Sequence, residues 1–220
     1  MTRRLLVTGL AVAAAGALAY ERVLRPRQER WGATDAEVGA PLPGDDLVPE
    51  PAQQVTRAIT IAAPPEAVWP WIVQLGADRA GFYSYDALEN LFGLGIHSAD
   101  RIVDEGQDLA VGEVVHANRA GTGGWLVVGC DPGVALHLQV CDVASGRALE
   151  RDRAPGWEFL WTFALVPTDG GTRLLVRERV AFGNPAIRAA MYPVGAVSFV
   201  MTRRMLLGIR ARAEATTRRS

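Results

Sequence analysis

The chain has 220 residues, 49% of them hydrophobic, and a formal net charge of −1 at pH 7. This length accommodates one well-buried domain with an appendage rather than two domains. All 23 basic residues are arginines, so chemistry that needs a lysine, such as Schiff-base formation or phosphate binding by a P-loop, is excluded.

Residues 5–20 form an uncharged, mostly apolar run near the N-terminus. The run is slightly short for a membrane-spanning helix, which takes roughly 20 apolar residues, although Val23 and Leu24 can extend it. It also fits a secretory signal with a basic start and a small-residue cleavage site near Ala19. Arginines are more numerous after the run than before it, which favours an uncleaved anchor with the remainder on the cytoplasmic side. We expect residues 1–30 to be a membrane anchor with a basic flank; the alternative is export after cleavage.

Residues 31–54 are rich in proline, glycine and aspartate, which predicts a tether. A globular domain is expected over residues 55–215 and a basic tail over 216–220. Residues 203–220 carry six arginines and one glutamate. The basic C-terminal helix can therefore contact an anionic membrane surface, which makes the membrane an expected partner together with residues 5–20.

The globular part opens with an alternating strand over residues 54–61, which Pro64 and Pro65 stop. Pro65 suits the first position of a helix. This helix carries an apolar stripe, formed by Val68, Trp71, Ile72 and Leu75. A second short helix is expected after Ser84 as its N-cap, with Leu88, Leu91 and Phe92 on its apolar side and Gly93 at its end.

Five strand candidates and one long helix complete the chain. The strands are expected over residues 110–117, 125–130, 134–141, 158–166 and 172–182, with hairpin turns at 131–133 and 169–171. The helix is expected from about 185 to 215, with a break near Pro193. Cys130 and Cys141 fall at opposite ends of the first hairpin, roughly 20 Å apart at about 3.3 Å per residue, which excludes a disulfide between them.

Four segments carry a resemblance to a known family. Ile59–Trp71, Gly81–Asp86, Phe199–Met201 and Arg203–Leu206 resemble the SRPBCC or START-like superfamily, in particular its bacterial polyketide cyclase/dehydrase-like members, over about residues 31–213. The resemblance implies an α+β helix-grip fold, in which a curved antiparallel sheet wraps around a long C-terminal helix and encloses an apolar cavity. Such folds serve lipid carriers, small-molecule sensors and a minority of enzymes, so the fold alone does not define the function.

Strand alternation predicts which side chains face the cavity. Residues 157, 159, 161, 163 and 165 share one face, which is mostly aromatic and is expected to point inward. Outward arginines at 173, 177 and 179 place Glu178 inward. An inward carboxylate is costly unless paired, so three roles are open to Glu178: contact with a polar group of a ligand, proton transfer with a raised pKa, or a salt bridge.

The predicted site follows from these faces. The expected ligand-binding residues are Trp71, Tyr83, Tyr85, Trp125, Trp157, Phe159, Trp161, Phe163, Val176, Val197 and Met201. The candidates for proton transfer are Tyr83, Tyr85, His97 and Glu178. The histidines are widely spaced and no metal, nucleotide or nucleic-acid motif is present, so we expect no metal, no cofactor and no nucleic-acid partner.

Three functions are compatible with this pattern. The first is a membrane-tethered protein that binds a hydrophobic small molecule or lipid in the cavity without catalysis. The second is an enzyme of the cyclase, aromatase or dehydratase type that uses the same cavity. The third is a non-catalytic module that binds a partner at the membrane.

Overall fold

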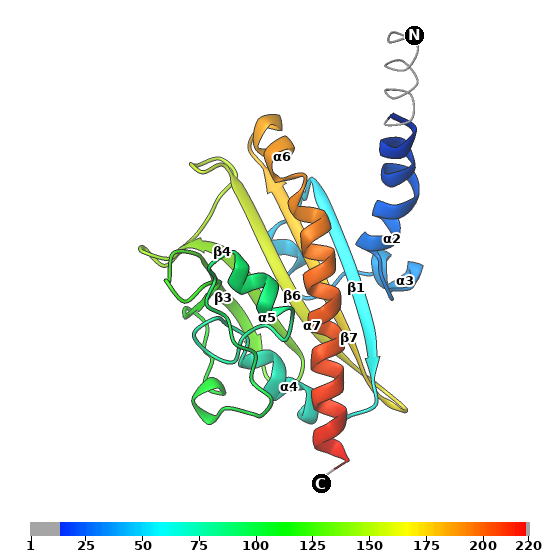
Figure 1. Ribbon diagram of the computed structural model, residues 1–220, viewed down its shortest axis with the longest axis vertical. Helices are drawn as coiled ribbons and strands as arrows, with labels where there is room; N and C mark the ends of the chain where they lie inside the picture. The colour runs from blue at the N-terminus through cyan, green and yellow to red at the C-terminus, as the bar shows by residue number, and fades with distance from the viewer. Residues whose placement is uncertain (1–13, 219–220) are drawn as a thin grey trace.

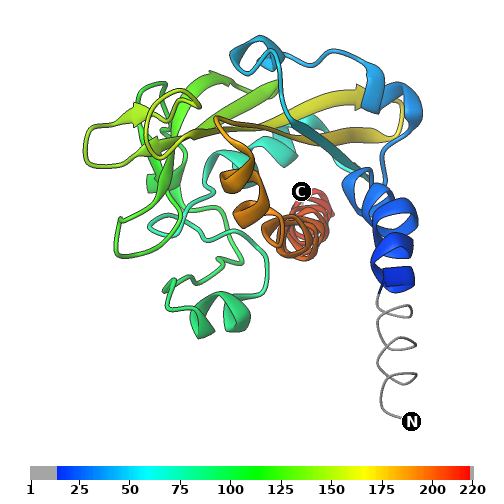
Figure 2. The same ribbon diagram turned by 90° about the horizontal axis from the view of Figure 1, so that it is seen from above.

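A curved antiparallel sheet wraps around a long C-terminal helix in the computed structural model, which describes residues 14–218 (Figure 1). Seven strands form the sheet, in the order β1-β7-β6-β4-β3-β2, with β5 paired to β4. Seen from above, the sheet curves over the helix α7, which lies on its concave side (Figure 2). Two parts of the expected α+β helix-grip fold are therefore confirmed: the curved antiparallel sheet and the long C-terminal helix.

The elements have the following bounds. The strands are β1 (Gln53–Ile61), β2 (Val114–His116), β3 (Gly124–Asp131), β4 (Ala135–Asp142), β5 (Arg147–Ala148), β6 (Trp157–Thr168) and β7 (Gly171–Phe182). The helices are η1 (Tyr20–Leu24), α2 (Arg25–Glu29), α3 (Asp35–Gly39), η2 (Asp45–Leu47), α4 (Pro65–Val73), α5 (Asp86–Leu91), η3 (Asp104–Gly106), α6 (Pro185–Met191) and α7 (Val194–Thr217).

Most predicted elements are present, with two exceptions among the strands. Only Val114–His116 of the expected strand 110–117 pairs with a neighbour, and the two-residue strand β5 had no signal in the sequence. The break near Pro193 is confirmed, since α6 ends at Met191 and α7 begins at Val194. Cys130 and Cys141 are free thiols near opposite ends of the β3–β4 hairpin, as their spacing predicted.

Helix α4 begins as its sequence predicted. Pro65 occupies the first turn, where the missing N–H of proline has no partner to lose. Its apolar stripe packs against the concave face of the sheet: Val68, Trp71, Ile72 and Leu75 are all at most 2% exposed. The helix therefore closes one end of the core.

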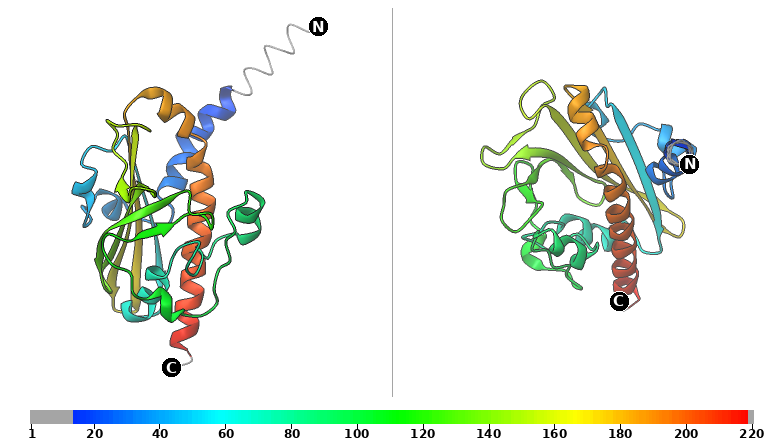
Figure 3. Two further views of the ribbon diagram at one scale, coloured as in Figure 1. Left: turned by 90° about the vertical axis from the view of Figure 1, so that its left-hand side faces the viewer. Right: turned by 45° about the horizontal axis from the view of Figure 1, so that its top comes forward.

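Helix α5 differs from the prediction in both its cap and its buried face. Ser84 does not cap it; its hydroxyl donates to the backbone carbonyl of Met201 at 3.3 Å, and Tyr85 occupies the N-cap position without a side-chain bond. The apolar residues Leu91 and Phe92 are 78% and 73% exposed, whereas Glu89 is only 4% exposed. The physical reason is that α5 stands away from the sheet, beyond α7 (Figures 2 and 3), so its apolar side meets no sheet surface.

The two halves of α7 have different surroundings. Its C-terminal half is packed into the core through Met205, Leu206, Ile209 and Ala213. The N-terminal half has no fully buried residue before Thr202 and lies over an open part of the concave face. This division leaves space for a cavity under the first turns of α7.

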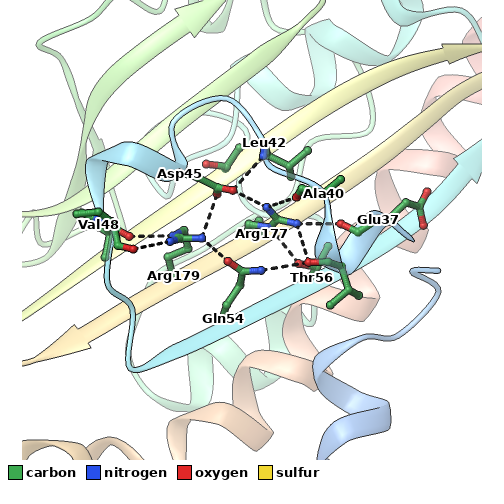
Figure 4. Close-up of polar contacts among 12 residues, drawn as sticks. Glu37, Ala40, Leu42, Asp45, Val48, Gln54, Thr56, Arg177 and Arg179 are labelled. Atoms are coloured by element: carbon green, nitrogen blue, oxygen red, sulfur yellow. Dashed lines mark hydrogen bonds and ion pairs between the residues drawn. The ribbon is translucent and has the colours of Figure 1, made fainter. Parts of the chain in front are cut away.

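Residues 31–51, here called the covering segment, lie across the outer face of the sheet (Figure 4). The composition of this segment predicted a tether. Val48 is fully buried against Leu160 and Ala181, and Arg177 of β7 donates to the backbone carbonyls of Glu37 and Ala40 at 2.9 Å each. The segment therefore covers outward side chains of the sheet that the strand pattern placed in solvent. Burial of Arg177 is tolerated because its guanidinium donates to the backbone carbonyls of the segment in place of water.

The apolar run 5–20 lies mostly outside the described residues, so the structure does not test the predicted anchor. Residues 14–19 are helical and lead into η1. Within residues 14–218, no helix is long and apolar enough to cross a membrane.

Candidate ligand cavity

An apolar cavity with two adjoining compartments lies between the concave face of the sheet and the N-terminal half of α7. The compartments measure about 440 Å³ and about 420 Å³. They share a boundary formed by Ala117, Trp125, Trp161, Val194, Ser198, Met201 and Thr202. Trp125 and Trp161 lie against each other there, with ring centroids 5.3 Å apart.

The first compartment is bounded by the sheet, by the N-terminal helices and by the start of α7. The sheet contributes Val55, Trp157, Phe159 and Val180, and the N-terminal helices contribute Tyr20, Arg25, Gln28 and Glu29. The guanidinium of Arg25 lies 4.9 Å from the ring centre of Tyr192, at the junction of α6 and α7. The N-terminal helices are thus part of the cavity wall.

A buried ion pair contributes part of the polar lining of the first compartment. Nη1 of Arg57 on β1 donates to Glu178 on β7 at 2.6 Å, and the two side chains are 2% and 8% exposed. The hydroxyls of Ser198 and Thr202 donate to the same carboxylate at 2.9 and 3.2 Å, and Arg57 Nε donates to the carbonyl of Gln28 at 3.0 Å. These bonds offset the cost of removing two charges from water, since a buried pair is tolerated when its remaining atoms are bonded.

The second compartment is lined by apolar side chains from α5 and the residues around it, together with α7. These are Phe82, Leu88, Phe92, Leu94, Ile96, Val197 and Met205. Among the described residues that line this compartment, Glu89 is the one ionisable group. Its Oε2 is buried without a hydrogen-bond partner, and burial, assisted by the nearby charge of Asp86, raises the pKa of Glu89 to about 7.

Six of the predicted ligand-binding residues line the cavity, and so does Glu178. The six are Trp125, Trp157, Phe159, Trp161, Val197 and Met201. The inward direction of the aromatic face of β6 is the property that places three of them there.

Three other predicted ligand-binding residues lie in the packed core instead. Trp71, Phe163 and Val176 are at most 2% exposed and line neither compartment. Phe163 and Val176 face the concave side, but residues of α4, Trp71 among them, and of the C-terminal half of α7 fill the space there.

Tyr83 and Tyr85 also lie outside the cavity. Tyr83 is 1% exposed and accepts a hydrogen bond from Gln74 at 2.7 Å, and burial raises the pKa of its hydroxyl. Its ring and that of Trp71 pack edge to face, and the guanidinium of Arg212 lies 4.8 Å from the centre of the Tyr83 ring. Tyr85 is 42% exposed beneath Arg204, and His97 is exposed. None of these three side chains is placed to move a proton inside the cavity.

Several polar residues of the cavity were not predicted from the sequence. Arg57 alternates along β1 with the outward residue Thr56, and Glu178 was expected to point inward on β7. Their pairing depends on the register between these two strands, which local alternation does not record. Ser198 and Thr202 lie one turn apart on α7 and carry no motif. Nothing in the sequence predicted the burial of Glu89, because an acid in a short amphipathic helix is usually exposed to solvent. No group of three or more metal-binding side chains occurs in the described part of the chain.

Comparisons with known proteins give structural similarities at low identity. No family model matches the sequence, and no curated protein matches it. The AHSA1-like protein from Aeromonas hydrophila is similar at 17% identity, with a TM-score of 0.38, over 75% of this chain and 94% of its own. The Polyketide_cyc-like protein from Corynebacterium glutamicum is similar at 17% identity, with a TM-score of 0.37, over 76% of this chain and 94% of its own.

A third solved structure, a protein from Mesorhizobium loti, is similar at 18% identity, with a TM-score of 0.44, over 74% of this chain and 98% of its own. Because the sequence identities are this low, the fold is described from the sheet order and the position of α7 in this chain alone.

Proposed function

We propose that this protein binds a hydrophobic small molecule or lipid in the two-compartment cavity between the sheet and α7. The observation that carries the proposal is the cavity itself, with an aromatic boundary and charged or hydroxyl groups confined to a few positions. Ligand sites in proteins are usually concave, about 300–1,000 Å³ in volume and mostly apolar, with a few polar groups that fix orientation. Each compartment falls within that range.

The positions of the proton-transfer candidates favour binding over catalysis. Tyr83, Tyr85 and His97 lie outside the cavity. Glu178 lines it, but Arg57, Ser198 and Thr202 already bond its carboxylate. A general acid or base has to reach the reacting group within about 2.6–3.2 Å, directly or through one water. A cyclase or dehydratase activity is therefore the weaker proposal for this cavity.

We further propose that residues 5–20 tether the chain to a membrane. The support is the uncharged composition of that run and the arginines that follow it. Arg203 and Arg204 on α7 are exposed and can add contact with anionic lipid. Cell fractionation of the full chain tests this: the wild type is expected in the membrane pellet, and Leu10→Arg with Ala14→Arg is expected to move it to the supernatant. Equal distribution of the two would contradict the tether.

The binding proposal is tested with a cavity-filling substitution. Ala117 lies at the boundary of both compartments, so Ala117→Phe fills space that a ligand would occupy. We expect an apolar fluorescent dye to bind the full-length wild type and to bind Ala117→Phe at least tenfold more weakly. Ala144→Phe, at an exposed turn position, is the matched control and should bind like the wild type.

Two outcomes bear on the proposal. Native mass spectrometry of protein purified from its host should show an apolar ligand that is lost in Ala117→Phe. Absence of dye binding by the wild type, or unchanged binding by Ala117→Phe, would contradict it.

A further inference from the structure

Glu89 is a buried acid without a side-chain partner among residues 14–218. It is 4% exposed, its Oε2 has no hydrogen-bond partner, and no ion pair within these residues involves it. It projects from α5 at the wall of the second compartment. Removing a carboxyl group from water without a partner is costly, and most buried acids are paired for that reason. The unpaired state of Glu89 therefore calls for a partner that residues 14–218 do not supply.

The surroundings of Glu89 select the chemistry of that partner. The other described residues that line the second compartment are apolar, aromatic, serine or threonine, so none of them supplies a cation to this space. Phe82 and Trp125 meet edge to face there at 5.9 Å, and Trp161 adjoins Trp125. Aromatic faces attract an organic cation, and a carboxylate pairs with it.

We propose that Glu89 binds the protonated amino group of a lipophilic amine, whose hydrocarbon part occupies the aromatic second compartment. This inference rests on the proposed binding function and names the class of ligand. An ammonium group supplies the missing partner of the carboxylate and replaces the water that burial removes. The hydrocarbon part extends past Trp125 and Trp161 toward the first compartment.

A neutral oxygen-bearing ligand accounts for Glu89 less well. A ligand carbonyl requires only a donor, and glutamine or serine would donate without the cost of a buried acid. Charged hydrogen bonds are roughly twice as strong as neutral ones, so an acid is the better choice only where the ligand is charged. In the first compartment the acid Glu178 already has its cation, Arg57, so it does not compete for the amine.

The surrounding charges define how binding depends on pH. Asp86, on the same helix, accepts hydrogen bonds from Ser98 at 2.7 and 2.6 Å, and its charge acts on Glu89. Because Glu89 ionises near pH 7, its charge is present at pH 8 and largely absent at pH 5.5. An alkylamine stays protonated over that range, so its affinity is expected to rise with pH while that of a matched alcohol stays constant.

The test compares decylamine with 1-decanol, both below the concentration at which micelles form, by displacement of an apolar dye from the full-length protein at pH 8. We expect the wild type to bind decylamine at least tenfold more tightly than decanol. Glu89→Gln should lose this preference while its affinity for decanol stays within threefold of the wild type. Glu66→Gln, which removes an exposed acid from α4, is the control and should keep the preference.

Each result has one meaning. Equal affinities of the wild type for the two probes, or an unchanged preference in Glu89→Gln, overturn the inference and leave the proposed function standing if decanol still binds. If neither probe displaces the dye, or no dye binds, both proposals fail. Should Glu89→Gln not fold, the wild type alone decides: a fivefold gain in decylamine affinity from pH 5.5 to 8, without a gain for decanol, is required.

Discussion

Arg57 and Glu178 are diagonal neighbours on the concave face: Arg57 lies opposite Val176 and Glu178 lies opposite Val55, on the antiparallel strands β1 and β7. The register brings the guanidinium within 2.6 Å of the carboxylate, although 121 residues separate the two in sequence. The pair therefore links β1 to β7, and hydrogen bonds from the hydroxyls of Ser198 and Thr202 link the carboxylate to α7.

We expect Arg57→Leu to destabilise the protein by about 3–5 kcal/mol, because it leaves the charge of Glu178 buried without its cation. The double variant Arg57→Leu with Glu178→Leu should lose less than the sum of the two single variants, by about 1–3 kcal/mol. Urea denaturation of the four proteins in the cycle measures this coupling. Strict additivity would mean that the pair contributes no interaction energy.

The covering segment depends on Arg177 of β7. This side chain is 1% exposed and donates to Glu37 and Ala40 carbonyls, to the hydroxyl of Thr56 and to the carboxylate of Asp45 at 2.6 Å (Figure 4). Arg177→Gln should cost about 2–4 kcal/mol, since several buried acceptors lose their donor.

The same variant should also expose the covering segment to protease. Limited proteolysis followed by mass spectrometry is expected to show faster cleavage within residues 41–51 in Arg177→Gln than in the wild type. Arg147→Gln, at an exposed position of β5, is the control and should be cleaved like the wild type. Equal cleavage in all three proteins would show that Arg177 does not hold the segment.

Glu89 makes stability depend on pH in a defined direction. Its pKa is raised from the ordinary value of 4.5 to about 7 in the folded protein, so between these values the folded state binds more protons than the unfolded state. Stability is therefore expected to fall as the pH rises from about 4.5 to about 7, by about 1–3 kcal/mol from this group.

Glu89→Gln should remove that part of the pH dependence. We expect the variant to be more stable than the wild type at pH 8 and similar to it at pH 4, with thermal unfolding at both values as the measurement. A parallel shift of wild type and variant across the range would mean that Glu89 keeps its ordinary pKa.

The approach of α7 to Tyr83 leaves no room for a side chain at Gly208. A Cβ placed there would lie 2.5 Å from the backbone oxygen of Tyr83, which itself has a φ of 55°. Glycine to alanine within a helix normally stabilises by up to about 1 kcal/mol. Gly208→Ala should instead destabilise by about 1–3 kcal/mol, because helix and loop must separate.

Gly195, in the first turn of the same helix, provides the matched control. A Cβ at that position meets no atom within 4 Å. Gly195→Ala should leave the melting temperature unchanged or raise it slightly, and an equal loss in both variants would argue against the contact between α7 and Tyr83.

Local periodicity in the sequence determined the succession of elements and the direction of their faces. The alternation of β6 placed Trp157, Phe159 and Trp161 on the concave side, and the outward arginines of β7 placed Glu178 inward. Pro65 and Pro193 marked the start of α4 and the break before α7. These properties depend on residues within a few positions of one another, so the sequence contains them directly.

Tertiary structure decided which of those faces became cavity and which became core. Phe163 shares its face with Trp161, yet the C-terminal half of α7 and α4 cover it, while Trp161 lines both compartments. The burial of Glu89, the partner of Arg57 and the packing of Val48 on the outer face arise from contacts between segments far apart in the chain. Their energies depend on what each surface meets after folding, which no local pattern of residues records.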